Sequence, residues 1–99
     1  MAIGDVIASS LIASTSGFLS MQPSGTEQWV IHNISHQSDA DLFINTTLAS
    51  NKISTHVDGG AWVGYFLHNT ASQYYSVRNV DSTGASGKLL TFDGIVTHL

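Results

Sequence analysis

Apolar residues in this chain recur at every second position more often than at every third or fourth, most clearly between Gln28 and Val80. A period of two is that of half-buried β-strands, whose successive side chains point to opposite faces of a sheet. The predicted strands are residues 6–14, 17–22, 28–36, 40–47, 52–57, 61–68, 73–80 and 88–98. The pattern therefore predicts an all-β chain.

Short runs of turn-forming residues separate these predicted strands. They lie at residues 23–25, 37–39, 58–60, 69–72 and 81–87. The run Asp58-Gly59-Gly60 is the strongest local hairpin signal, because glycine tolerates the positive φ angles that tight hairpins need. Connections this short favour meandering antiparallel pairing, closed as an antiparallel β-sandwich or a small jelly-roll-like barrel of about eight short strands.

The first 16 residues differ in composition from residues 17–99. We expect residues 17–99 to form a single β-sandwich domain. Residues 1–16 are rich in Ala, Ser and Ile, with weak alternation and few side chains large enough to anchor a core. The segment is either an ordinary first strand or an arm that adds a strand to a neighbouring subunit, since sheet edges offer unpaired backbone groups. As an arm it would contribute these interface residues: Ile3, Val6, Ile7 and Leu11.

Charge and cysteine content narrow the classes of function. The net charge is −4, and the strong cations are Lys52, Arg78 and Lys88, scattered along the chain. No basic stripe exists to neutralise phosphates, so we expect no nucleic-acid partner. The absence of cysteine excludes disulfides and thiolate metal sites. The apolar stretch 3–13 carries Asp5 and is too short to cross a bilayer, so we expect no membrane partner.

Five histidines and one acidic pair are the candidates for metal or catalytic chemistry. His32 and His36 would lie roughly 13 Å apart on a strand, too far to share a zinc ion. A metal or catalytic site would require histidines such as His32, His56 or His68 to converge from different strands. Asp39 and Asp41 place two carboxylates on one strand face, but nothing near them in sequence completes a cation site. With no ordered nucleophile motif either, we predict no enzyme, no catalytic or metal residues and no cofactor.

Aromatic residues supply the burial energy of a small sandwich and also dominate protein interfaces. The aromatic residues expected in the core are Trp29, Phe43, Trp62 and Phe66. Tyr74 and Tyr75 are adjacent, so in a regular strand they point to opposite faces. One of the two tyrosines should therefore lie outside the core, where a partner subunit or a sugar ring could stack on it.

Three segments resemble parts of small structural proteins from tailed bacteriophages. The first, 21–34, contains a Gln-Pro pair, a glycine turn and the pattern Glu27-x-Trp29-x-Ile31; the others are 60–79 and the closing 92–97. Together they span most of the chain after residue 20. The resemblance implies a β-sandwich virion protein, a head decoration or cement protein that assembles as a homotrimer on the capsid. The implied partner is the major capsid protein or another virion protein.

Two functions follow as hypotheses. The first is a non-enzymatic cement protein that is made in the host cytoplasm and binds the outer capsid surface as an oligomer, with Tyr74, Tyr75 and the N-terminal segment as contacts. The alternative is a carbohydrate-binding or host-attachment module of a tail or head fibre. In that case Tyr74 or Tyr75 stacks on a sugar, and Asp39 or Asp41 accepts its hydroxyl groups.

Overall fold

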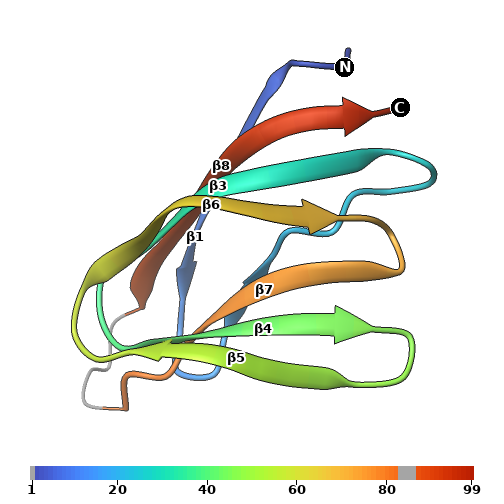
Figure 1. Ribbon diagram of the computed structural model, residues 1–99. Coiled ribbons are helices and arrows are strands. Elements are labelled where there is room, and N and C mark those ends of the chain that lie inside the picture. The colour runs from blue at the N-terminus through green and yellow to red at the C-terminus, as the bar shows by residue number, and fades with distance from the viewer. Residues whose placement is uncertain (1, 83–86) are drawn as a thin grey trace.

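The computed structural model describes residues 2–82 and 87–99 and contains β-strands and turns (Figure 1). The strands are β1 (Val6–Ala13), β2 (Phe18–Ser20), β3 (Gln28–His36), β4 (Ala40–Thr46), β5 (Ser50–His56), β6 (Gly60–Asn69), β7 (Gln73–Asn79) and β8 (Lys88–His98). The predicted all-β class is confirmed. Within the described residues, no helix is long and apolar enough to cross a bilayer. Most of the turn predicted at 81–87 falls on residues 83–86, outside the described ranges.

The eight strands form two antiparallel sheets of four, ordered β1-β8-β3-β6 and β2-β7-β4-β5. Every connection except the one between β4 and β5 carries the chain from one sheet to the other. Eight antiparallel strands wound in this order form two Greek keys, which is the topology of a jelly roll. In Figure 1, β8, β3 and β6 lie above β7, β4 and β5, and the predicted β-sandwich is confirmed.

The meandering pairing predicted from the short turns is wrong, and residues 58–60 do not close a hairpin. β5 pairs with β4, whereas β6 pairs with β3 in the other sheet. Asp58 adopts φ 67° and donates its N–H to the Asp39 carboxylate, and a Cβ on Gly59 would lie 2.8 Å from the Gln37 carbonyl oxygen. Turn chemistry specifies where the chain reverses, but packing decides which strand it then meets.

The core lies between the two sheets and is built from side chains at alternating positions. In β8, for example, Leu90, Phe92 and Val96 are buried. The largest fully buried apolar residues include Met21, Ile31, Ile34, Leu42, Trp62, Val77, Leu90 and Val96. Each large apolar side chain that is buried contributes about 1.5–3 kcal/mol. These residues supply the stability that a chain without disulfides requires.

Irregular pairing between β3 and β6, in the β1-β8-β3-β6 sheet, changes which residues of β6 face the core. Ile31 and Asn33 of β3 pair with Leu67 and Val63 of β6, so residues 64–66 bulge opposite His32. Gly64 adopts φ 74° within this bulge, a conformation that glycine adopts without steric cost. The inward positions of β6 consequently shift from even to odd residue numbers.

This shift explains why the core position predicted for Phe66 is wrong: the ring is 82% exposed, whereas Trp62 is buried. Of the other predicted core aromatics, Trp29 is half-buried and packs against the core. Phe43 is half-buried on the outer face of its sheet, so its predicted core position is also wrong.

The N-terminal segment forms β1, an edge strand of the same sandwich, which is the first-strand alternative. It pairs with β8 from Val6↔Ile95 to Ala13↔Lys88 without a register shift. Of its eight residues, only Ile7 and Ala13 are buried. The first strand of the sandwich is therefore paired directly with the last.

Candidate functional site

A hollow of about 170 Å³ lies on the outer face of the β2-β7-β4-β5 sheet. Alternation along β7 creates it, because Val77 faces the core while its neighbours in the strand face outward. The lining residues are Phe18 of β2, Phe43 and Asn45 of β4, Ser50 of β5, and Tyr74, Ser76 and Arg78 of β7. The hollow therefore combines aromatic rings with hydroxyl, amide and guanidinium groups.

Arg78 is the charged group of this hollow. Its guanidinium carbon lies 4.7 Å from the centre of the Phe43 ring, a cation–π contact worth about 0.5–1 kcal/mol at a partly exposed site. Its Nε is buried and has no hydrogen-bond partner among the described residues. A buried donor without an acceptor costs stability, but because Nε is buried it is not itself an atom that a ligand in the hollow can reach.

The nearest acidic residue in the sheet register does not neutralise Arg78. Asp41 is the cross-strand partner of Arg78, but its carboxylate accepts a hydrogen bond from Thr55 and lies 3.9 Å from Lys52 Nζ. Asp41 therefore faces the β5 side of the sheet. Because both ion pairs of the described residues involve lysines, the guanidinium of Arg78 keeps its charge for an external partner.

The floor of the hollow is held in place by hydrogen bonds within the protein. The Asn45 amide nitrogen donates to the Tyr74 carbonyl oxygen and to Ser76 Oγ, at 3.3 and 3.0 Å. Its amide oxygen accepts from Ser50 Oγ at 2.6 Å. Since both amide N–H groups of Asn45 are already engaged, Arg78 and the Tyr74 hydroxyl are among the groups of the lining that remain to contact a ligand.

The two adjacent tyrosines point in opposite directions, as predicted. Tyr74 lines the hollow, whereas Tyr75 packs against the core. Of the two carboxylates expected beside a sugar, Asp41 lies outside the hollow, and Asp39 accepts a hydrogen bond from the backbone of Asp58. The hollow therefore contains one of the predicted tyrosines and neither of the predicted aspartates.

The predicted N-terminal interface residues divide into two groups. Ile3, Val6 and Leu11 are 66%, 78% and 41% exposed and remain available to a partner. Ile7 is only 8% exposed and belongs to the core cluster. Its place in the β1–β8 register, opposite Gly94, directs its side chain toward the core, so it is less accessible to a partner than the other three.

The histidines that come together are His36 and His56; the alternative considered from the sequence was convergence of His32, His56 or His68. His36 Nε2 lies 2.8 Å from His56 Nδ1, and the His56 ring stacks on Trp62 with centroids 3.9 Å apart. His32 contacts the Phe66 ring edge-on, and His68 bonds to the Gln28 side chain. Among the described residues, no group of three or more potential ligands could hold a metal ion.

The geometry at His36 fixes its protonation. Nδ1 lies 2.7 Å from the Ser38 carbonyl oxygen, and since a carbonyl only accepts, Nδ1 carries the proton. Nε2 of the neutral ring then accepts from Nδ1–H of His56. Burial lowers the pKa of His36, and the neighbouring His56 adds to this effect. The pair joins the end of β3 to the end of β5, so its role is to hold the two sheets together.

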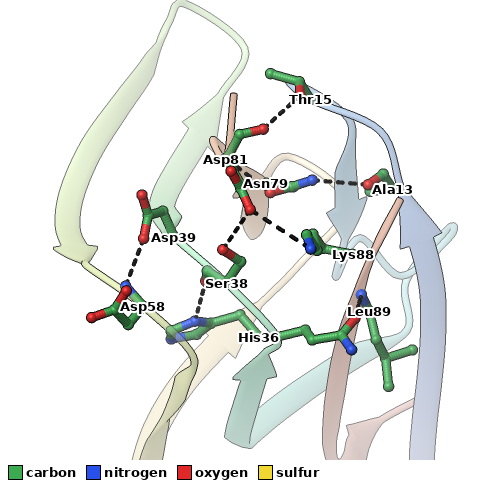
Figure 2. A network of polar contacts seen from close by, with 11 residues as sticks. Ala13, Thr15, His36, Ser38, Asp39, Asp58, Asn79, Asp81, Lys88 and Leu89 are labelled. Atoms are coloured by element: carbon green, nitrogen blue, oxygen red, sulfur yellow. Dashed lines mark hydrogen bonds and ion pairs between the residues drawn. The ribbon is translucent and has the colours of Figure 1, made fainter. Parts of the chain in front are cut away.

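A polar network beside these histidines ties loops to strands (Figure 2). The Asp81 carboxylate accepts from Ser38 Oγ at 2.7 Å and lies 3.8 Å from Lys88 Nζ, while its carbonyl accepts from Thr15. The Asn79 side chain donates to the Ala13 carbonyl at 2.9 Å and accepts from the Asp81 backbone N–H. Asp81 is itself buried, so these contacts connect the loops to the strands inside the protein. This network around Asp81 and Asn79 is called the structural clasp below.

The outer face of the other sheet is a second candidate surface, and it is broad and nearly uncharged. Cross-strand pairing places Ala8, Asp93, Asn33 and Val63 in one row across all four strands. Asp93, the acidic residue of this row, accepts a hydrogen bond from Asn33 at 2.9 Å. Exposed apolar residues on this face include Val6, Ile12, Val63 and Leu89, between 39% and 78% exposed.

Sequence reasoning found Tyr74 but missed Phe18, Phe43 and Arg78 as its neighbours. Period-two alternation already places residues 74, 76 and 78 on one face. The register that brings β2 and β4 beside β7 depends on contacts across the sheet, which the pattern within one strand does not contain.

No protein-family model matches this chain, and no curated protein matches it significantly.

Proposed function

We propose that the chain is a non-enzymatic structural protein of a tailed-phage virion that decorates the outer surface of the capsid as an oligomer. Its partner would be the major capsid protein or another virion protein, reached after synthesis in the host cytoplasm. The observation that carries this proposal is the broad, nearly uncharged outer face of the β1-β8-β3-β6 sheet. The resemblance of residues 21–34, 60–79 and 92–97 to phage structural proteins points in the same direction.

The chemistry of this face suits attachment to a protein lattice. The exposed apolar side chains are separated by small polar ones such as Ser10, Ser35 and Thr91, which occupy one cross-strand row. Interfaces of this kind combine apolar contacts with hydrogen bonds and contain few charges at their centre. Repetition over a capsid would multiply weak contacts into strong retention.

Co-sedimentation of the purified protein with emptied or expanded capsids of its phage tests the proposal. We expect the wild-type protein to bind in a saturable number of copies. Val63→Lys places an unpaired charge among the exposed apolar residues of the face, and we expect it to lower affinity at least tenfold. Leu48→Lys is the control, because Leu48 is 94% exposed in the β4–β5 turn. Absence of wild-type binding, or equal binding of both variants, would refute the proposal.

A deletion of residues 1–14 would not be a clean test. β1 pairs with β8 along its whole length and buries Ile7 and Ala13. Removing it would expose β8 and part of the core, so lost binding would also reflect lost folding. Point substitutions on the outer face avoid this problem.

A second candidate function, carbohydrate binding in host attachment, is favoured by the Arg78 hollow. Exposed faces of Phe18 and Tyr74 suit the apolar side of a sugar ring, and Arg78 suits a carboxylate on that sugar. The hollow is smaller than the roughly 300–1,000 Å³ of typical ligand pockets, so it would hold one terminal sugar of a longer glycan.

A glycan array that includes acidic sugars tests this second candidate. We expect binding that is lost in Arg78→Gln and Tyr74→Ala and retained in Tyr65→Ala. Tyr65 is a suitable control because it is 45% exposed on β6, in the other sheet. No glycan bound by the wild-type protein, or binding that survives Arg78→Gln, would exclude this function for the hollow.

A further inference from the structure

The four edge strands of the sandwich differ in how well they are protected against pairing with another chain. A sheet edge exposes unpaired N–H and C=O groups, and proteins protect such edges with short strands, bulges or lysines. β2 has three residues. β5 carries Lys52 and a register shift beside Ile53. β6 carries the bulge at residues 64–66.

β1 has none of these protections. It is eight residues long, contains no charge and no proline, and pairs with β8 without a register shift. Val6 and Ile12, near its two ends, are 78% and 64% exposed. A long, regular and apolar edge is the kind of strand that another strand extends.

The hydrogen-bonding direction along β1 follows from its neighbours. Val96 N–H donates to the Asp5 carbonyl, so Val96, Gly94, Phe92 and Leu90 of β8 direct their backbone groups toward β1. Hydrogen bonds alternate along an antiparallel pair. The backbone groups on the free side of β1 therefore belong to these residues: Val6, Ala8, Ser10 and Ile12.

We propose that β1 pairs with β1 of a second copy of this chain, antiparallel and centred on Ser9. In this register Val6 lies opposite Ile12 and Ala8 lies opposite Ser10, and among the described residues no strand other than β8 pairs with the backbone of these four. Twofold symmetry repeats each pair, which gives about eight backbone hydrogen bonds. On the inner face Ile7 lies opposite Leu11, so apolar side chains meet apolar side chains on both faces.

Electrostatic repulsion does not prevent two copies from pairing along β1, although each chain carries a net charge of −4. Asp5, the acidic residue beside β1, would lie opposite Ala13 of the second copy and not opposite another carboxylate. The twofold axis would run perpendicular to the sheet, so the two outer faces would form one continuous surface. Such pairing closes with two subunits, and the proposal is therefore a dimer and not the trimer implied by the resemblance to phage proteins.

Sedimentation velocity on the purified protein tests the proposal without any capsid, so its outcome is independent of the proposed attachment function. We expect a species of twice the 10.5 kDa chain mass, formed reversibly in a dilution series. Ile12→Lys should weaken this dimer at least tenfold, since it places a charge opposite Val6. Val63→Lys is the matched control, because Val63 is 68% exposed on the opposite edge strand.

Single-cysteine variants test the register, and the absence of native cysteine makes them unambiguous. Ser9 would face itself across the axis in a non-hydrogen-bonded pair, with Cα atoms about 4.5 Å apart, a separation that a disulfide spans. We expect Ser9→Cys to form a covalent dimer on mild oxidation much faster than Ser10→Cys. A monomer at every concentration, a trimer, a dimer that Ile12→Lys leaves intact, or equal cross-linking of both variants would overturn the proposal.

Discussion

Gly94 is the residue whose substitution tests the packing of the first sheet most directly. It lies in β8 between Ile31 of β3 and Ile7 of β1. A Cβ at this position would lie 2.1 Å from the Val30 carbonyl oxygen and 2.8 Å from the Ile31 Cα. Both are backbone atoms in a central strand, so Gly94→Ala can be accommodated only if β3 and β8 separate.

The expected cost follows from that separation. Strands that part by about 1 Å weaken two ladder hydrogen bonds, each worth about 1 kcal/mol, and disturb packing at a further cost of about 1–3 kcal/mol. We therefore expect Gly94→Ala to lower the free energy of unfolding by about 3 kcal/mol. For a domain of this size the melting temperature should fall by roughly 12–24 °C.

Urea unfolding followed by circular dichroism measures this effect, with Gly60→Ala as the control. A Cβ on Gly60 would meet the His36 ring at an ordinary 3.7 Å, so we expect a change within about 0.5 kcal/mol. If Gly94→Ala unfolds at the same urea concentration as Gly60→Ala, the close approach of β3 and β8 is refuted.

Three further predictions concern the histidine pair and the structural clasp. Because burial lowers the pKa of folded His36, the unfolded chain binds this proton more readily. The contribution of this group to stability should be complete above about pH 6.5 and should fall as the pH decreases toward the folded pKa. The urea midpoint of His36→Gln should therefore depend less on pH than that of the wild type over pH 5–7.5. The same pH dependence in both proteins would contradict this. Trp62→Phe removes the Nε1 hydrogen bond to Ser54 and reduces the ring area that stacks on His56, and it should cost about 1–3 kcal/mol in thermal unfolding. No loss would show that these contacts contribute nothing. Asp81→Ala leaves Ser38 and Lys88 without their acceptor and should cost about 1–3 kcal/mol in the same assay, with Asp93→Ala on the outer face as a milder comparison.

Much of the fold could be predicted from the sequence, because it depends on patterns within single strands. Strands β3 and β8 match the predicted ranges to the residue, and the outward position of one tyrosine followed from alternation alone. The order of strands in the sheets could not be predicted in this way, because the turn at 58–60 has the same local sequence whether it closes a hairpin or joins two sheets. Phe66 was misplaced because the bulge at 64–66 depends on pairing with β3, which residues of β6 alone do not specify.

The candidate site was predicted only in part for the same reason. Tyr74 could be identified from its own strand, but the contact of Arg78 with Phe43 requires the register between β7 and β4. The pairing of His36 with His56 arises where the ends of β3 and β5 meet between the sheets. Such contacts are separated by 20 residues or more in sequence and come from the folded topology.

The pairing of the first strand with the last has a consequence for how the chain acquires its structure. Val6 meets Ile95, and Ala13 meets Lys88, so this sheet cannot be completed until β8 has left the ribosome. Folds dominated by contacts so distant in sequence fold slowly, in milliseconds to seconds. During synthesis the uncharged β1 segment therefore remains without its partner strand until the last residues of β8 have been made.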